Sequence, residues 1–454
     1  MSSGLFETFN AVSTKQWKQK IQFDLNGADF NDTLIWNSND DIAVKPFYNA
    51  DDLENLALTS TASTSPWHIG QSIFVAHVEK SNVNALNAIK GGAESIHFII
   101  PSEDAISIED LLKNINTETV SIHFELQFLS VNFIKKLITL TGKNNITVAV
   151  DIIGNLAKSG NWFQSLNHDF STFETSLQTS KSVTINTAVY QNAGANMVQQ
   201  LAYALAHANE YLHALKPESL VGSQISFNVA IGSNYFFEIA KLRALRLLWE
   251  TLAEEYNIHI DCHINATPTK RNKTLYDYNT NMLRTTTECM SAILGGANTV
   301  YNLPHDAIHR KTNEFSERIA RNQLLILKHE SHFNKVNTIA DGSYYIESLT
   351  HQLAEKALDV FKDIERNGGF LNQLKSGTIQ RKIKESADKE QLQFNNGEAI
   401  LVGINKFCNP NDTMAQDLQL YPFVKTNRRK TLIAPIIEKR LAEQVEQVRL
   451  KKGR

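Results

Sequence analysis

The chain of 454 residues is 42% hydrophobic and 20% charged, a composition typical of a globular protein with one large domain or two medium ones. Its 45 Lys and Arg residues are balanced by 48 Asp and Glu residues, so the formal net charge is −3. This balance disfavours a strongly basic surface and therefore argues against nucleic acid as a partner.

Apolar runs and cysteines indicate the compartment. The sequence has no run of about 18 apolar residues, which argues against a membrane span. Cys262, Cys289 and Cys408 lie far apart and form no CxxC pair, so we expect neither a disulfide framework nor a zinc ribbon. The N-terminal stretch MSSGLFETFNAVSTKQWKQK has no apolar core and no Arg, so no targeting signal is predicted. These features predict a cytoplasmic protein with no membrane partner.

The first predicted unit is an N-terminal arm at residues 1–60. It contains DFNDTLIWNSNDDIAVKPFYNADDL, whose Phe, Trp and Ile residues favour a docked arm over a disordered one. The Ser/Thr-rich stretch ALTSTASTSP joins this arm to the next unit.

Eight β-rich runs follow between Ser72 and Pro304, with helical patterns between them. In order they are SIFVAHV, SIHFII, VSIHFEL, ITVAVDII, SVTIN, ISFNVAI, IHIDCHI and NTVYNLP. Alternating strands and helices predict right-handed parallel crossovers, and eight such units are the number that closes a TIM barrel. The sequence therefore predicts the α/β class, with a (β/α)8 TIM barrel over residues 61–335. An open doubly wound sheet is the alternative.

A C-terminal helical extension is predicted for residues 336–454. It includes LTHQLAEKALDVFKDIERNGG, in which two glycines are placed to end the helix. The final stretch IIEKRLAEQVEQVRLKKGR is charged and amphipathic. It could bind a partner or form a solvated end, and the pattern favours the solvated end.

The common catalytic signatures are absent from the sequence. Neither GxGxxG, nor GxxxxGK[ST], nor GxSxG occurs, so a phosphate cradle and a nucleophile elbow are not predicted. The stretch TINTAVYQNAGA, residues 184–195, resembles the strand, loop and helix on which barrel enzymes carry catalytic groups. Tyr190 is its only titratable residue.

The stretch HIDCH is the best metal candidate, but its spacing disfavours chelation. On a strand, His259 and His263 would lie about 13 Å apart, so these two and Asp261 could not hold one ion together. No metal site is predicted. The overlapping stretch DCHINA nearly matches the DxHxxG that supplies a cobalamin ligand in adenosylcobalamin mutases. It departs from that motif at Ala266, so a ligand role for His263 is disfavoured.

Several longer stretches resemble the barrel half of the methylmalonyl-CoA mutase family. They are NYFFEIAKLRALRLLWETL, NMLRTTTECMSAILGGANTVYNLPHDA, NEFSERIARNQLLILKHES, DGSYYIESLTHQLAEKA and GEAILVGINKF, and the arm's WNSNDDIAVKPFYNADDL is also similar. The resemblance is collinear from about residue 20 to 440. It implies a (β/α)8 barrel whose bore takes coenzyme A in catalytic members, with adenosylcobalamin held between the barrel and a further domain.

The catalytic positions of the family differ in this chain. Catalytic members carry WTIRQY, whereas this chain has WHIGQS, so Gly70 replaces the arginine and Ser72 the tyrosine. They also carry YHMQEAGA where this chain has AVYQNAGA, so Val189 replaces the histidine. A carboxylate-binding arginine is expected between the fourth strand and this loop, but the first arginine in the chain is Arg243. The resemblance thus implies no catalytic and no cofactor-binding residue in this chain.

These replacements are expected for the family's small, non-catalytic subunit. The implied partner is the catalytic large subunit, which would hold the adenosylcobalamin, and the implied reaction interconverts methylmalonyl-CoA and succinyl-CoA. We expect residues 1–60 to contact that partner. We also expect Phe, Ile and His of the early strands to plug the bore. The matched polar residues are expected to be scaffolding: Arg284, Thr285, Thr286, Arg318 and Arg321.

Two other functions stay open. One is an active acyl-CoA mutase barrel of altered specificity that recruits a separate cobalamin-binding chain. The other is a binding module, such as a chaperone-like partner, that has diverged from mutases.

Overall fold

The computed structural model describes residues 12–54, 66–104, 106–142, 145–260, 262–337, 339–414, 417–425 and 429–453. Most of the predicted linker and Asp261 of the metal candidate lie outside these ranges. Among the described residues, no helix is both long and apolar enough to cross a membrane.

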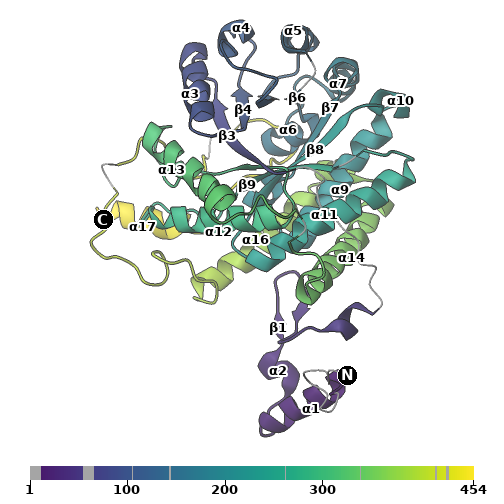
Figure 1. Ribbon diagram of the computed structural model, residues 1–454, viewed down its shortest axis with the longest axis vertical. Helices are drawn as coiled ribbons and strands as arrows, with labels where there is room; N and C mark the ends of the chain where they lie inside the picture. The colour runs from purple at the N-terminus through teal and green to yellow at the C-terminus, as the bar shows by residue number, and fades with distance from the viewer. Residues whose placement is uncertain are drawn as a thin grey trace, which may run out of the picture.

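Eight parallel strands form one sheet that curls into a nearly closed barrel (Figure 1). The strands are β3 (His68–Phe74), β4 (Ser95–Ile100), β5 (Ser121–Leu126), β6 (Ile146–Ala149), β7 (Ser182–Asn186), β8 (Gln224–Ile231), β9 (Cys262–Pro268) and β10 (Thr299–Tyr301). Their order is β6-β5-β4-β3-β10-β9-β8-β7. The predicted (β/α)8 barrel is therefore confirmed.

Helices of the connecting segments surround the barrel (Figure 1). They are α3 (Val78–Lys90), α4 (Ile108–Leu111), α5 (Val131–Thr141), α6 (Ile152–Ser159), α7 (Leu166–Ser180), α8 (Ala188–Asn192), α9 (Met197–Ala214), α10 (Pro217–Leu220), α11 (Tyr235–Glu255), α12 (Thr280–Leu294), α13 (Glu314–Leu325) and the π-helix η2 (Ile326–Glu330). Several of these helices begin at a residue whose side chain caps the first turn. For example, Asn196 and Gln199 form a capping box at the start of α9.

Alternation along each strand separates an apolar outer face from a polar inner face. Phe98 and Phe124 are fully buried in the main core, with ring centroids 5.7 Å apart. His123 and His263 come from β5 and β9, which are not neighbours in the sheet, yet their ring centroids are 6.1 Å apart. Two such rings can meet only inside the barrel. The histidines therefore face the bore, whereas these phenylalanines face the helices.

Two strands begin at other residues than the sequence patterns predict, β3 four residues earlier and β9 four residues later. The first barrel strand starts at His68 rather than Ser72, and β9 starts at Cys262 rather than Ile258. In both, the strand's inner face carries His, Gly or Asn, so the apolar run marks only part of the strand. WHIGQS therefore lies largely within the first strand and not before it.

β6 and β7 are the two edge strands of the sheet, and in the described residues they are not paired by backbone hydrogen bonds. Asp151, just beyond β6, accepts a hydrogen bond from the backbone N–H of Asn186 at the end of β7 (2.8 Å). The same carboxylate accepts from the backbone N–H of Gly154 (2.8 Å) and so caps α6. One side chain thus links both edges of the barrel sheet.

The C-terminal part begins with α14 (Tyr344–Arg366), which packs against α9 and α11 (Figure 1). Gly368 and Gly369 have φ of 96° and 86°, a left-handed conformation that ends the helix as predicted. α15 (Phe370–Lys375), α16 (Thr378–Asn395) and α17 (Glu443–Lys451) follow. The extension is only partly helical, because the described residues between α16 and α17 are mostly irregular.

The final charged stretch is packed against the barrel, so its prediction as a solvated end was wrong. Arg440 pairs with Glu446 at 2.7 Å, and both side chains are buried. Glu446 also accepts from the backbone N–H of Leu275 (2.7 Å), and the Arg449 guanidinium lies 3.7 Å from the Tyr276 ring centroid. Charged residues that look solvated in sequence here form a buried contact with the β9–α12 loop.

The N-terminal arm projects from the barrel on the side of α14 (Figure 1). It contains α1 (Thr14–Asp24), α2 (Phe30–Leu34), the antiparallel pair β1 (Trp36–Asn37) and β2 (Ala43–Val44), and the 3-10 helix η1 (Ala50–Leu53). The tip of the β1–β2 hairpin docks on the barrel, where Asp40 accepts from the backbone N–H groups of Met197 and Val198 (2.6 and 3.3 Å). The arm is therefore docked at this point.

Docking of the hairpin tip should depend on pH. Burial raises the pKa of Asp40 from 3.8 to about 6, against the lowering effect of the two backbone hydrogen bonds. The docked arm therefore binds a proton more tightly than the free arm, so docking is strongest below about pH 4 and weakens as pH rises through 6. Hydrogen exchange of residues 36–44, corrected for intrinsic rates, should show roughly 30-fold less protection at pH 7.5 than at pH 4.5.

The matched control is Asp40→Asn, which keeps an acceptor for α9 but cannot titrate. Protection of its hairpin should be the same at both pH values. Equal corrected protection of the unaltered chain at pH 4.5 and 7.5 would show that Asp40 does not govern docking.

Candidate functional site

A cavity of about 360 Å3 opens at the carboxyl ends of β5 to β8. Active sites of TIM barrels lie at this end of the strands. Its lining includes Glu125, Gln127, Asp151, Lys158, Val189 and Asn228. Val189, one of the three positions singled out in the sequence, therefore lies at the place where barrel enzymes carry out chemistry.

The bore below this cavity is lined with uncharged imidazoles. His123 and His263 face each other across it. Burial, together with the neighbouring rings of His263, His97 and His68, holds the pKa of His123 well below its usual value. Burial and Arg246 lower the pKa of His263 to about 4. The two rings are therefore neutral near pH 7 and offer no positive charge to a carboxylate.

Tyr301 fills the space beside Gly70. A Cβ atom at Gly70 would lie 2.3 Å from Cδ1 of Tyr301, far inside contact distance. The Tyr301 hydroxyl lies 3.3 Å from Oγ of Ser95, and its ring centroid lies 5.4 Å from that of His97. Any side chain at position 70 would have to displace this ring. The expected plug thus exists, but Tyr301 and histidines form it, whereas Phe98 and Phe124 of the early strands face outward.

Ser72, the second position, belongs to a chain of polar contacts at the mouth of the bore. Its Oγ lies 3.3 Å from Nδ1 of His97, and Nε2 of the same ring lies 3.3 Å from Oε2 of Glu125. The three residues come from the neighbouring strands β3, β4 and β5. The sequence reasoning missed this grouping. The period of two in SIHFII and VSIHFEL was the available signal, because it places His97 and Glu125 on one face.

The loop that carries Val189 is held by a buried network. Tyr190 is fully buried, and its hydroxyl lies 2.9 Å from Nδ1 of His207. Nε2 of His207 lies 3.0 Å from Asp151, which also accepts from the Tyr211 hydroxyl (2.8 Å). Burial alone would raise the pKa of Asp151, but His207 and backbone hydrogen bonds lower it overall. The one titratable residue of the loop therefore anchors it and points away from the cavity.

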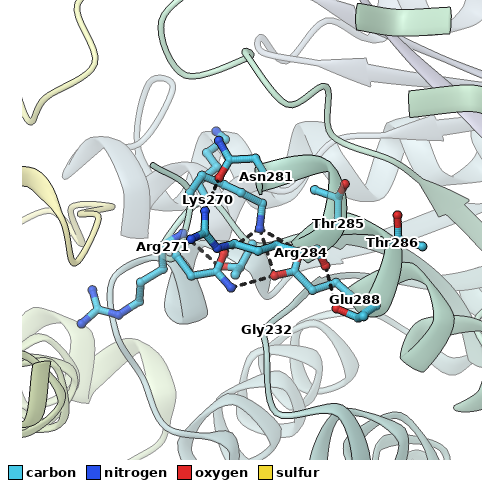
Figure 2. Close-up of polar contacts among 12 residues, drawn as sticks. Gly232, Lys270, Arg271, Asn281, Arg284, Thr285, Thr286 and Glu288 are labelled. Atoms are coloured by element: carbon cyan, nitrogen blue, oxygen red, sulfur yellow. Dashed lines mark hydrogen bonds and ion pairs between the residues drawn. The ribbon is translucent and has the colours of Figure 1, made fainter. Parts of the chain in front are cut away.

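The polar residues of α12 that were singled out in the sequence contact other residues of the chain. Arg284 donates to Asn281 (2.8 Å), as Figure 2 shows, and to the backbone carbonyl of Val402 (2.6 Å). The hydroxyls of Thr285 and Thr286 donate to the backbone carbonyl of Met282. These contacts lie within α12 or join it to another part of the same chain.

A buried ion pair joins the β9–α12 loop to α12. Glu288, labelled in Figure 2, pairs with Lys273 at 2.7 Å and accepts from Asn272 at the same distance. Arg271 extends away from this cluster toward Glu390 of α16 (2.5 Å). Arg321 of α13 donates to the backbone carbonyl of Gly91 (3.1 Å). These charges join the loop and helices to one another.

The metal and cobalamin candidates do not form a site in the described residues. His263 lies on β9 and faces the bore, whereas His259 precedes the strand. The described residues contain no group of three or more His, Cys, Asp or Glu residues arranged to hold a metal ion. Nε2 of His263 lies 3.4 Å from the Thr299 hydroxyl, and the side chain is half-buried.

Comparison with known proteins gives consistent matches. The model of the methylmalonyl-CoA mutase family matches residues 103–452. The methylmalonyl-CoA mutase small subunit of Porphyromonas gingivalis is 34% identical over 441 residues, which cover 89% of this chain and 71% of that protein. The methylmalonyl-CoA mutase of Cereibacter sphaeroides is 29% identical over 454 residues, which cover 86% of this chain and 64% of that protein. This chain thus spans only part of the length of these relatives.

The contact between Gly70 and Tyr301 can be tested by a double-mutant cycle. Gly70→Ala should lower the free energy of unfolding by about 1–3 kcal/mol, because the added methyl group overpacks the bore. The same change in a Tyr301→Ala background should lower it much less, so the two effects should not add. Urea unfolding of the four proteins measures this coupling.

Tyr301→Phe is the matched control, since it keeps the ring and removes only the hydroxyl. Gly70→Ala should be as destabilising in this background as in the unaltered chain. Additive effects of Gly70→Ala and Tyr301→Ala would mean that the ring does not fill this space.

Proposed function

Because the chain belongs to the methylmalonyl-CoA mutase family, we propose that it is the small, non-catalytic subunit of a heterodimeric, adenosylcobalamin-dependent methylmalonyl-CoA mutase. In this proposal its partner is the catalytic large subunit, which interconverts (R)-methylmalonyl-CoA and succinyl-CoA. The chain itself supplies no catalytic residue to that isomerisation. Its cytoplasmic location, suggested by the cysteine pattern, is part of the same proposal.

The filled bore is the observation that carries the proposal. A substrate carboxylate in a dry bore requires a bidentate arginine, and a thioester carbonyl requires a hydrogen-bond donor. Gly70 leaves no room for an arginine beside the Tyr301 ring. At the mouth, Val189 offers a buried apolar side chain where the resemblance implies an imidazole. This combination supports a barrel that does not handle the substrate.

The residues of this chain do not fit adenosylcobalamin. In the nearest match to its ligand motif, His263 holds the ligand position, and its ring lies inside the bore with its centroid 6.1 Å from that of His123. A ligand histidine must present a free ring nitrogen to a large flat cofactor, and this one is enclosed by strands. We therefore assign the cofactor to the partner subunit, and derive no step through it for this chain.

The arm is the part of the chain best suited to contact the partner. No residue of α1 is buried, and large apolar side chains on the arm face solvent: Trp17 is 45% exposed, Phe23 77% and Trp36 52%. Exposed apolar residues gathered on a projecting element are typical of an interaction surface. We therefore retain residues 1–60 as a partner-contacting arm, 61–335 as the barrel and 336–454 as the extension that braces it.

Purification of the tagged chain from its native cell tests the proposal as a whole. The expected result is a one-to-one complex with a larger chain that shows corrinoid absorption and methylmalonyl-CoA mutase activity. A lone, colourless chain would contradict the proposal. If that lone chain bound an acyl-CoA, the alternative of an active barrel with a separate cobalamin-binding chain would be favoured.

The role of the arm can be tested within that complex. The double substitution Trp17→Ser and Phe23→Ser should weaken association at least tenfold, about 1.4 kcal/mol, because exposed aromatic residues contribute strongly to interfaces. Val221→Ser is the matched control, since Val221 is 71% exposed but lies away from the arm, just before β8. Sedimentation of the recombined subunits measures the affinity. Unchanged affinity of the double variant would remove the arm from the interface.

A further inference from the structure

Three bore residues have the order of contacts found in nucleophilic enzymes. The Ser72 hydroxyl oxygen lies 3.3 Å from Nδ1 of His97, and Nε2 of that ring lies 3.3 Å from the Glu125 carboxylate. Ser72 stands opposite His97 in the register of β3 and β4, and Glu125 stands opposite Ile99, two residues further along. The parallel sheet therefore holds a hydroxyl, an imidazole and a carboxylate in one row on its inner face.

This row contains the elements that activate a serine. A nucleophile within reach of a base, with the base oriented by a third group, is the signature of nucleophilic catalysis, and such contacts are often loose without substrate. Burial would raise the pKa of Glu125, but the hydrogen bond and charge of His97 lower it overall. Glu125 is thus a carboxylate near pH 7 and can hold the ring in place.

One end of the row borders an open cavity. The His97 and Glu125 side chains are 15% and 27% exposed, and Glu125 lines the cavity of about 360 Å3 at the barrel mouth. Tyr301 packs beside His97 with ring centroids 5.4 Å apart and limits the depth of the site. Ser72 is half-buried behind these two residues, so only a compact acyl group could reach it, because a long substrate cannot thread the filled bore.

We propose that Ser72, His97 and Glu125 form an acyl-transfer site that hydrolyses small acyl esters or thioesters. Ser72 Oγ attacks the acyl carbon while its proton passes to Nδ1 of His97. The alcohol or thiol leaves with that proton, and the acyl group stays on Ser72 as an ester. A water molecule then gives a proton to His97 and attacks this ester. The carboxylic acid is released and the serine regains its proton.

The chemistry of the site limits its substrates. The three side chains supply a nucleophile, a base and a positioning carboxylate, but not the oxyanion donors that accelerate hydrolysis of ordinary esters and amides. The substrate must therefore carry a good leaving group. The inference concerns this chain alone and does not depend on the proposed mutase partner.

Acylation of the full-length chain tests the proposal. The probes are p-nitrophenyl acetate, an activated ester, and S-acetyl-N-acetylcysteamine, a small thioester. We expect one acetyl group on Ser72, located by peptide mass spectrometry, and its loss in Ser72→Ala. Acetylation by either probe supports the proposal and identifies the leaving group that the site accepts. Acetylation by neither probe, or equal turnover by Ser72→Ala, overturns it.

Further variants separate catalysis from folding. Ser72→Cys keeps a nucleophile and should still be acetylated, whereas His97→Asn should lower the acylation rate by about 100-fold or more. Glu125→Gln should lower kcat with little change in KM, and Glu125→Asp should restore part of it. Ser95→Ala is the matched control, since this bore serine contacts Tyr301 rather than an imidazole and should leave turnover unchanged. Equal turnover by His97→Asn would also overturn the proposal.

Discussion

The close contact between the Tyr301 ring and the backbone of Gly70 determines whether the bore of this barrel is open or closed. Tyr301 on β10 occupies the space that a side chain at Gly70 on β3 would need. Protein interiors are packed too tightly for both to fit. The bore is consequently closed where a substrate channel would have to pass, and the neutral His123 ring lies beside the closure, with its centroid 6.3 Å from that of Tyr301. A closed bore suits a barrel that supports another chain.

With the bore closed, several polar residues at the carboxyl end of the barrel hold its strands and loops together. Asp151 joins the two edge strands of the sheet and, through His207, holds the buried Tyr190 of the α8 loop. A loop that looks catalytic in sequence therefore has a mechanical role. The polar row at the mouth is different, because Glu125 of that row lines the open cavity. The same end of the barrel thus combines a closed bore with a small accessible pocket.

Much of the fold could be predicted because strand and helix periodicities survive in the sequence. All eight barrel strands fall on or beside apolar runs. The first strand was misplaced because the His68, Gly70 and Ser72 side of β3 is polar and reads as a loop. The plug was predicted to include phenylalanines besides histidines, because alternation alone does not say which face is inward. Only the contact between rings of β5 and β9 does so.

Contacts between segments far apart in the chain were beyond prediction. The burial of Arg440 and Glu446 depends on the β9–α12 loop, more than 160 residues earlier. Docking of Asp40 depends on the start of α9. In sequence, such charges look solvated, because their partners are fixed only by the folded chain. For the row of Ser72, His97 and Glu125, alternation indicated the face of each strand, but the register that brings the three side chains together is known only from the folded sheet.

Titration of methylmalonyl-CoA into the purified full-length chain, followed by calorimetry, tests the central claim most directly. We expect no saturable binding, because the Tyr301 ring closes the bore beside Gly70. Stoichiometric, saturable binding would contradict it, and would mean that the bore opens and that the barrel handles the substrate itself.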